Sequence, residues 1–151
     1  MKHALASALL LAPVLAWATP PDACTILTMD EINSVAGAGA AEKVQPVKAG
    51  NPTECNFVDA KKAAVLSIKM REVQYAAKDE LGQERESLEK IYHAKAKELT
   101  AIGEKSYWMG PVHQLLFYKG HTLVFVTFQQ PKNQNEVASA QIARMIESKL
   151  K

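Results

Sequence analysis

Residues 113–128 constrain the fold more than any other stretch, because they hold two runs rich in β-branched and aromatic residues separated by Lys119 and Gly120. This pattern predicts a β-hairpin, and a glycine in second place suits a two-residue type I′ turn. The predicted register pairs Tyr118 with His121, Leu116 with Leu123 and Gln114 with Phe125 on one face, and Phe117 with Thr122 and Leu115 with Val124 on the other. Both faces carry large apolar groups, so we expect a small α+β domain with helices packed on the sheet.

The first 18 residues match a secretory signal peptide. A positive region at 1–3 precedes an apolar stretch at 4–15 and an A-x-A site at 16–18, so cleavage is expected after Ala18. An uncleaved anchor is the alternative, but the apolar stretch is interrupted by a proline and is shorter than the roughly 20 residues that cross a bilayer. We therefore expect a periplasmic or secreted protein without stable membrane insertion.

The exported part is expected to form one α+β domain at residues 19–151. Removing 18 of 151 residues leaves 133, enough for one compact domain but not for two. Without Lys2, 17 Lys and Arg residues stand against 16 Asp and Glu residues. This near balance provides no long-range field for nucleic acid or an anionic membrane.

Two cysteines, Cys24 and Cys55, remain in the exported chain. In an oxidising compartment such a pair is most simply a structural disulfide, and closing a loop of about 30 residues contributes on the order of 3 to 4 kcal/mol to stability. A redox or metal-binding role is the alternative, but the pair lacks C-x-x-C spacing.

The clearest helix start is the capping box formed by Thr28 and Glu31. Leu27 and Ile32 occupy the positions of a hydrophobic staple, and Gly37 is expected to end the helix. Near the other end of the chain, Asn135 is a fair N-cap for a final helix. The apolar face of that final helix would consist of Ala138, Ile142, Met145, Ile146 and Leu150.

Between these helices the sequence predicts an edge strand at 44–47, where Pro46 cannot donate to a central ladder. A hairpin with strands at 55–58 and 63–73 follows, and a further strand is expected at 106–109. In the strand at 63–73, apolar residues alternate with Ser67, Lys69 and Arg71, so we expect one face toward the core and the other toward water. Residues 76–96 predict a charged helix with a thin apolar stripe. The stripe would consist of Leu81, Leu88, Ile91 and Tyr92, with i,i+4 ion pairs between Arg85 and Glu89 and between Glu86 and Lys90. The spacing allows residues 99–105 to be either the end of this helix or a loop.

Residues 24–32, 54–57, 101–108 and 118–123, together with the amphipathic C-terminal end, resemble a broad group of small exported bacterial proteins. Many members of this group are lipoproteins or domains of unknown function. The resemblance implies a PsbP-type fold, with an antiparallel sheet flanked by helices on both faces, and a disulfide between the two matching cysteines. It also favours a tight loop at residues 99–105. The chain departs from the lipoprotein members because it lacks a lipid-attachment site before Cys24, and the resemblance supplies no catalytic residue.

No residue pattern points to a reaction. The predicted hairpin register separates His113 from His121, and His93 belongs to another helix, so we expect no metal site. The serines lack a G-x-S-x-G elbow, and the carboxylates on the charged helix lie on an exposed face that gives no desolvated cleft. Nucleotide glycine motifs are also missing from the sequence. We therefore assign no catalytic residue, metal or cofactor, and do not expect an enzyme.

Tyr107, Trp108 and Met109 precede a Gly-Pro turn and are the candidate patch for a partner or ligand. The alternative is that these aromatic residues fill the core. The function we favour is that of a non-catalytic envelope or secreted protein that binds another protein. The alternative is a small apolar ligand held between sheet and helix, and a hydrolase is the third interpretation.

Overall fold

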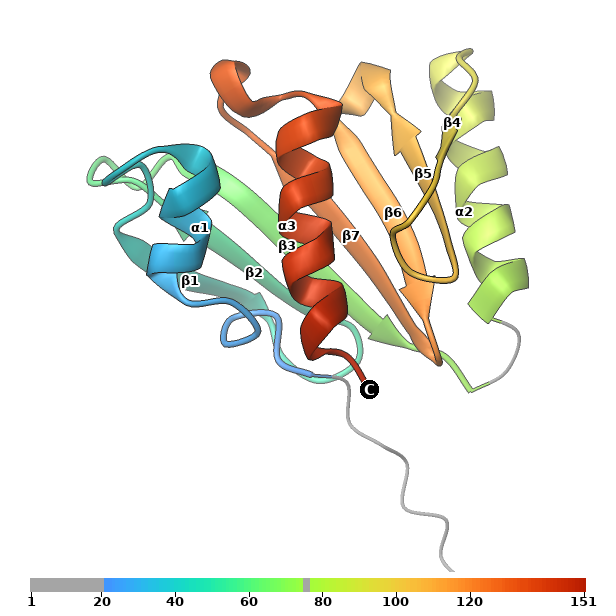
Figure 1. The fold of residues 1–151 in the computed structure, drawn as a ribbon, viewed down its shortest axis with the longest axis horizontal. Helices are drawn as coiled ribbons and strands as arrows, with labels where there is room; N and C mark the ends of the chain where they lie inside the picture. The colour runs from blue at the N-terminus through green and yellow to red at the C-terminus, as the bar shows by residue number, and fades with distance from the viewer. Residues whose placement is uncertain (1–20, 75–76) are drawn as a thin grey trace, which may run out of the picture.

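Seven antiparallel strands form one sheet in the order β1-β2-β3-β7-β6-β5-β4 in the computed structural model, which describes residues 21–74 and 77–151 (Figure 1). The described elements are α1 (Met29–Ala36), β1 (Lys43–Lys48), β2 (Thr53–Val58), β3 (Ala64–Glu72), α2 (Ala77–Tyr92), β4 (Lys97–Leu99), β5 (Lys105–Met109), the 3-10 helix η1 (Gly110–Val112), β6 (Gln114–Lys119), β7 (Thr122–Phe128), the 3-10 helix η2 (Pro131–Asn133) and α3 (Glu136–Lys149). The predicted α+β class with an antiparallel sheet is confirmed. The predicted signal peptide lies outside the described residues.

Strands β6 and β7 form the predicted hairpin, but the predicted register was wrong by two residues. The structure pairs Tyr118 with Leu123, Phe117 with Val124, Leu116 with Phe125, Leu115 with Val126 and Gln114 with Thr127. Gly120 takes the first central place of the turn with φ 56°, which is the glycine position of a type II′ turn. Its N–H donates to Glu104 Oε1 at 2.9 Å, which fixes the turn at this place. Because strand side chains alternate with a period of two, this shift left each residue of β6 and β7 on its predicted face, whereas His121 lies in the turn.

The first strand of this hairpin begins one residue later than predicted, at Gln114. His113 instead ends the 3-10 helix η1 with φ 52°, and its N–H donates to the Gly110 carbonyl oxygen at 3.1 Å. The Gly-Pro dipeptide that was predicted as a turn therefore forms this short helix.

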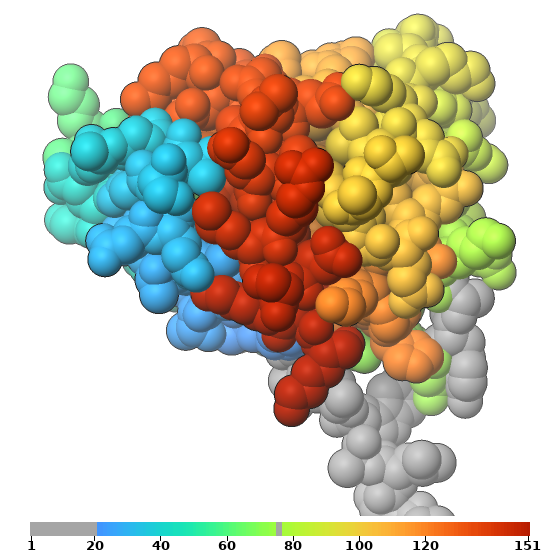
Figure 2. Space-filling view, in the orientation of Figure 1, coloured from blue at the N-terminus to red at the C-terminus, as the bar shows by residue number. Residues whose placement is uncertain are grey.

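Alternate residues of β6 and β7 belong to two buried clusters. The α3 core contains side chains of α1 and α3 together with Leu115, Phe117, Val124, Val126 and Phe128. The α2 core contains Ala77 and Leu81 of α2 together with Tyr107, Met109, Leu116, Tyr118, Leu123 and Phe125. In the space-filling view, α3 lies against the α1 segment on one side and against β4 and its following loop on the other (Figure 2).

The predicted disulfide is confirmed, with the Cα atoms of Cys24 and Cys55 5.1 Å apart. It joins the segment before α1 to β2. The predicted capping box is also present, because Thr28 Oγ1 accepts the Glu31 N–H at 3.2 Å and Glu31 Oε2 accepts the Thr28 N–H at 2.7 Å. Helix α1 ends at Gly37, whose φ of 109° is easily reached only by glycine.

Strand β1 is an edge strand, as the position of Pro46 predicted, and all its residues are exposed. Strands β2 and β3 form the second predicted hairpin. Leu66, Ile68 and Met70 of β3 are fully buried, whereas Ser67 and Lys69 are half-buried on the other side of the strand. This alternation was predicted, and it leaves polar side chains beside α2.

The predicted apolar stripe of α2 is not buried in the last turn of the helix. Ile91 and Tyr92 are 61% and 43% exposed, because the α2 core includes no residue of this helix beyond Leu88. The helix ends at Tyr92, and the next residue, His93, has φ 50°. The ion pair between Arg85 and Glu89 is present at 3.9 Å.

The segment after α2 contains a short strand, β4, that sequence reasoning missed. A loop with Gly103 at φ 60° then leads into β5. A Cβ at Gly103 would collide with the Tyr118 carbonyl oxygen and the Phe117 ring. Residues 100–104 therefore form a tight loop rather than the end of a helix.

The final helix α3 begins where predicted, and Asn135 Oδ1 accepts the Ala138 N–H at 2.9 Å. Ala138, Ile142, Ile146 and Leu150 of the predicted face are buried, while Met145 is only half-buried.

Candidate functional site

The three residues predicted as a binding patch are divided between the two cores. Tyr107 is 7% exposed and Met109 is 0% exposed, and both belong to the α2 core. Trp108 is half-buried against the α3 core, with its ring centre 6.4 Å from that of His113. Because neighbouring strand residues point in opposite directions, one partner cannot contact all three side chains at once. The binding role of this patch stays a prediction, and Trp108 is its most accessible member.

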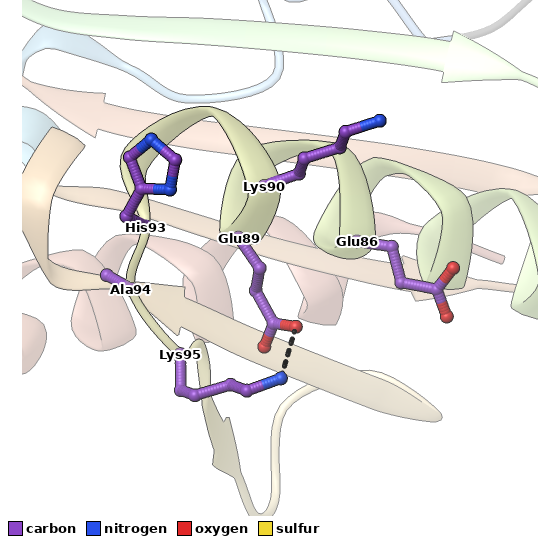
Figure 3. Close-up of a pocket in the computed structure, with 6 residues that line it drawn as sticks. All are labelled: Glu86, Glu89, Lys90, His93, Ala94 and Lys95. Atoms are coloured by element: carbon purple, nitrogen blue, oxygen red, sulfur yellow. Dashed lines mark hydrogen bonds and ion pairs between the residues drawn. The ribbon is translucent and has the colours of Figure 1, made fainter.

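A hollow of about 330 Å³ lies at the C-terminal end of α2 (Figure 3). It is lined by Glu86, Glu89, Lys90, His93, Ala94 and Lys95. In Figure 3, His93 and Lys90 point to one side of the helix end, whereas Glu89 and Lys95 point to the other. Because the imidazole and the carboxylate of Glu89 diverge, this hollow provides no acid–base pair.

Glu89 has a structural task in this hollow. One oxygen of its carboxylate accepts the Ala96 N–H at 2.9 Å, and the other lies 3.4 Å from Lys95 Nζ. The hydrogen bond from Ala96 is the largest cause of a lowered pKa of Glu89, followed by the bond from Lys95. Glu89 therefore holds the chain reversal after α2.

A second hollow, of about 260 Å³, crosses the sheet beside α2, and we call it the sheet groove. It is lined by Glu54, Ser67, Lys69, Glu84, Gln114, Phe125 and Thr127. The sheet register creates it, because Ser67 lies opposite Thr127 and Lys69 lies opposite Phe125 on adjacent strands. Glu84 of α2 forms its wall, so the groove marks the part of the sheet beside the helix that the helix does not cover.

The floor of the sheet groove is held by hydrogen bonds between side chains. Gln114 Nε2 donates to Thr127 Oγ1 at 3.0 Å, and Ser67 Oγ donates to Asn56 Oδ1. These bonds connect neighbouring strands and limit the rotamers of the groups that line the floor. A binding partner would therefore meet ordered polar groups, which lowers the entropy cost of recognition.

Charges of both signs stand around one aromatic ring in the sheet groove. Lys69 Nζ lies 5.4 Å from the centre of the Phe125 ring, within the range of a cation–π interaction. Glu54 lies opposite Lys69 on the adjacent strand. Neither Glu54 nor Lys69 forms an ion pair within residues 21–74 and 77–151, so both charges are available to a partner.

Arg71 positions the wall of the sheet groove. Its Nη2 atom contacts Glu80 Oε2 at 2.9 Å and Glu84 Oε1 at 3.1 Å, so one guanidinium of β3 binds two carboxylates of α2. The three side chains are partly exposed, and each contact is therefore modest in energy. Their joint effect is to set the position of α2 along the sheet.

The hydroxyl of Ser67 and the three histidines do not come together at the sheet groove. The Ser67 hydroxyl is bonded to an amide and not to a base that could activate it. His93, His113 and His121 lie respectively after α2, after η1 and in the β6–β7 turn. Among the described residues, no group of three or more His, Cys, Asp or Glu side chains could hold a metal ion. Sequence reasoning did not predict this groove. The polar residues that alternate along the strand predicted at 63–73 were the one feature of the sequence that indicated it.

The sequence matches no family model, and comparisons with curated proteins and with solved structures found no match. In the described part of the chain, no helix combines the length and the apolar character needed to span a membrane.

Proposed function

We propose that the protein is exported and acts without catalysis, by binding another protein at the sheet groove. The observation that carries this proposal is the ordered polar floor around Phe125, flanked by Glu54 and Lys69, whose charges form no ion pair in the described part of the chain. Mixed charges and amide groups around an aromatic ring suit the polar backbone and side chains of a protein surface. Both hollows described above are lined by charged side chains, which favours such a partner over a small apolar ligand.

The disulfide between Cys24 and Cys55 supports the location in this proposal, because disulfides persist in the periplasm and outside the cell. Export then begins with the signal peptide proposed at residues 1–18. Mass analysis of the protein recovered from its natural compartment tests this directly. A mature chain that begins at Thr19 is the expected result, and a chain that still carries residues 1–18 would contradict it.

We also propose that the architecture is of the PsbP type, with helices on both faces of the sheet. The alternation of β6 and β7 residues between the α3 core and the α2 core supports this arrangement. An experimental structure of the exported domain tests it. Placing α2 and α3 against the same face of the sheet would overturn it.

Photo-crosslinking in intact cells tests the binding proposal. A photoreactive residue at position 67, in the floor of the sheet groove, is expected to capture one discrete protein species. The matched control places the same residue at Ser148, an exposed serine of α3 far along the chain from the groove residues. Capture at position 67 but not at position 148 supports the proposal. The same species at both positions, or none at position 67, would contradict it.

A further inference from the structure

A row of polar side chains crosses five strands of the sheet at one level, and we call it the polar row. Its members lie directly opposite one another in the order Gln45, Asn56, Ser67, Thr127 and Gln114, on β1, β2, β3, β7 and β6. Residues directly opposite share a face of the sheet, so the five side chains stand side by side. Neighbouring strands lie about 4.8 Å apart, which gives the polar row a length of about 19 Å. It extends the floor of the sheet groove across β2 to the β1 edge.

The β1 end of the polar row is not covered by α2, which packs mainly against β5, β6 and β7. In Figure 1, α2 lies beside the β4 end of the sheet, away from β1. Gln45 is exposed, and the other four side chains of the row are half-buried. A partner can therefore reach the row from the sheet groove to the β1 edge.

The polar row keeps hydrogen-bonding groups that the fold does not use. Ser67 Oγ donates to Asn56 Oδ1, and Gln114 Nε2 donates to Thr127 Oγ1. In the described part of the chain, Asn56 Nδ2 and Gln114 Oε1 take no part in these or other hydrogen bonds. An amide side chain offers the same donor and acceptor as a peptide group. The row therefore suits the peptide groups of another protein.

Lysines dominate the charge of the open part of this face. Lys43 lies two residues before Gln45 on β1, so both side chains point to the same face. Lys48 lies opposite Glu54, and Glu54 lies opposite Lys69. None of these four charged side chains forms an ion pair within residues 21–74 and 77–151. Three positive charges against one negative charge leave this part of the face positive.

The opposite sign prevails where the face meets α2. There Arg71 binds Glu80 and Glu84, so one positive charge stands against two negative charges. An acidic segment is therefore attracted to β1, β2 and β3 and repelled from the helix. This separation of charge gives the partner a direction along the polar row.

Lysines on an edge strand can have another purpose, which is to prevent pairing with a second chain. Strand β1 already has this protection from Pro46, which has no N–H to donate, and from the register shift that follows Pro46. A glutamate would protect the edge as well as a lysine does, because either charge opposes strand addition. Charge reversal therefore separates edge protection from recognition of an acidic partner.

We propose that the partner presents an acidic polypeptide segment, which lies along the polar row with its carboxylates beside Lys43, Lys48 and Lys69. This inference rests on the proposed function, because it names the kind of protein that the sheet groove binds. A lipid bilayer fits this face less well, since Phe125, the large apolar side chain of the sheet groove, is only 7% exposed. Exposed ion pairs are weak and screened by salt, so binding weakens as the salt concentration rises.

Fluorescence anisotropy with a short labelled poly-glutamate peptide tests the charge of the partner, using the purified protein with its disulfide intact. The wild type is expected to bind the peptide, and Lys43→Glu/Lys48→Glu to bind it about tenfold more weakly, through two lost attractions and two new repulsions. Both lysines are exposed, so the melting temperature should stay close to that of the wild type.

Lys132→Glu is the matched control, because this exposed lysine of η2 lies beside Gly37 at the end of α1. It makes half the change in net charge and should alter the affinity by less than about twofold. A wild type that does not bind the peptide, or a control that weakens binding as much as the double variant, would overturn the inference. So would tighter binding of polygalacturonate or of phosphatidylglycerol vesicles than of the peptide.

Photo-crosslinking from position 67 in intact cells separates this inference from the proposed function. Capture of the partner is expected to fall several-fold in Lys43→Glu/Lys48→Glu and to persist in Lys132→Glu. Undiminished capture in the double variant would overturn the acidic segment while leaving the proposed function in place. Absence of capture in the wild type as well would overturn the proposed function itself.

Discussion

Helices α2 and α3 are similar in length but are held to the rest of the molecule in different ways. Of the 14 residues of α3, six are buried, whereas only Ala77 and Leu81 are buried among the 16 residues of α2. Apolar burial therefore fixes α3, while α2 depends more on the charge contacts of Arg71.

This difference indicates that the two sides of the domain contribute to different properties of the protein. The α3 side uses its apolar side chains for stability. The α2 side keeps polar and charged groups at the surface, where the sheet groove lies. Mutations on the two sides should therefore affect different properties.

The largest expected effect comes from removing the disulfide that joins the α1 segment to β2. With a sequence separation of 31, the Cys24→Ser/Cys55→Ser protein is expected to lose about 3 to 4 kcal/mol of unfolding free energy. Urea denaturation measures this loss. A decrease below about 1 kcal/mol would show that the α3 side does not depend on this bond.

Truncating one apolar residue on each helix compares the two sides directly. Ile142→Ala in α3 is expected to cost about 3 kcal/mol, because the isoleucine is fully buried in the α3 core. Leu88→Ala in α2 is expected to cost only about 1 kcal/mol, because that leucine is partly exposed. Equal losses in urea denaturation would remove the contrast between the helices.

Replacing Arg71 tests whether charge contacts hold α2. Arg71→Met is expected to lower the unfolding free energy by about 1 kcal/mol, since it removes the contacts to Glu80 and Glu84. Amide exchange in α2 should accelerate more than that in α3. Arg144→Met, at an exposed position of α3, is the control and should change stability by less than about 0.5 kcal/mol. Amide exchange that accelerates equally in α2 and α3 would contradict this role for Arg71.

The smallest expected effect is the pH dependence of the contact between α1 and α3. The bond from Lys149 at 2.6 Å, followed by that from the Thr28 N–H, lowers the pKa of Glu31. Ionised Glu31 therefore stabilises the fold above its unfolded-state pKa, and this contribution is lost as the pH falls through the folded-state pKa. Urea denaturation of Glu31→Gln across the acidic range should show a shallower decline than the wild type. Identical pH profiles would contradict this account.

Local sequence signals predicted the parts of the fold that depend on neighbouring residues. Thr28 and Glu31 located α1, and the two apolar faces of residues 113–128 were assigned correctly. The hairpin register was missed because Gly120 suits the second place of one turn type and the first place of another. Strand β4 was missed because its three residues are too few to show a period.

The sheet groove could be predicted only in part. The polar alternation of residues 63–73 indicated an uncovered face, but the groove also depends on how far α2 extends over the sheet. That limit is set by long-range contacts such as those from Arg71 to Glu80 and Glu84. The predicted grouping of Tyr107 with Trp108 ignored the alternation of strand side chains.

Native-state hydrogen exchange, measured residue by residue, tests most directly whether the molecule has one side built for stability and one for recognition. We expect the buried turns of α3 to exchange only when the whole domain unfolds, and the amides of α2 to exchange faster through local opening. Equal protection of the two helices, both at the level of global unfolding, would contradict the account.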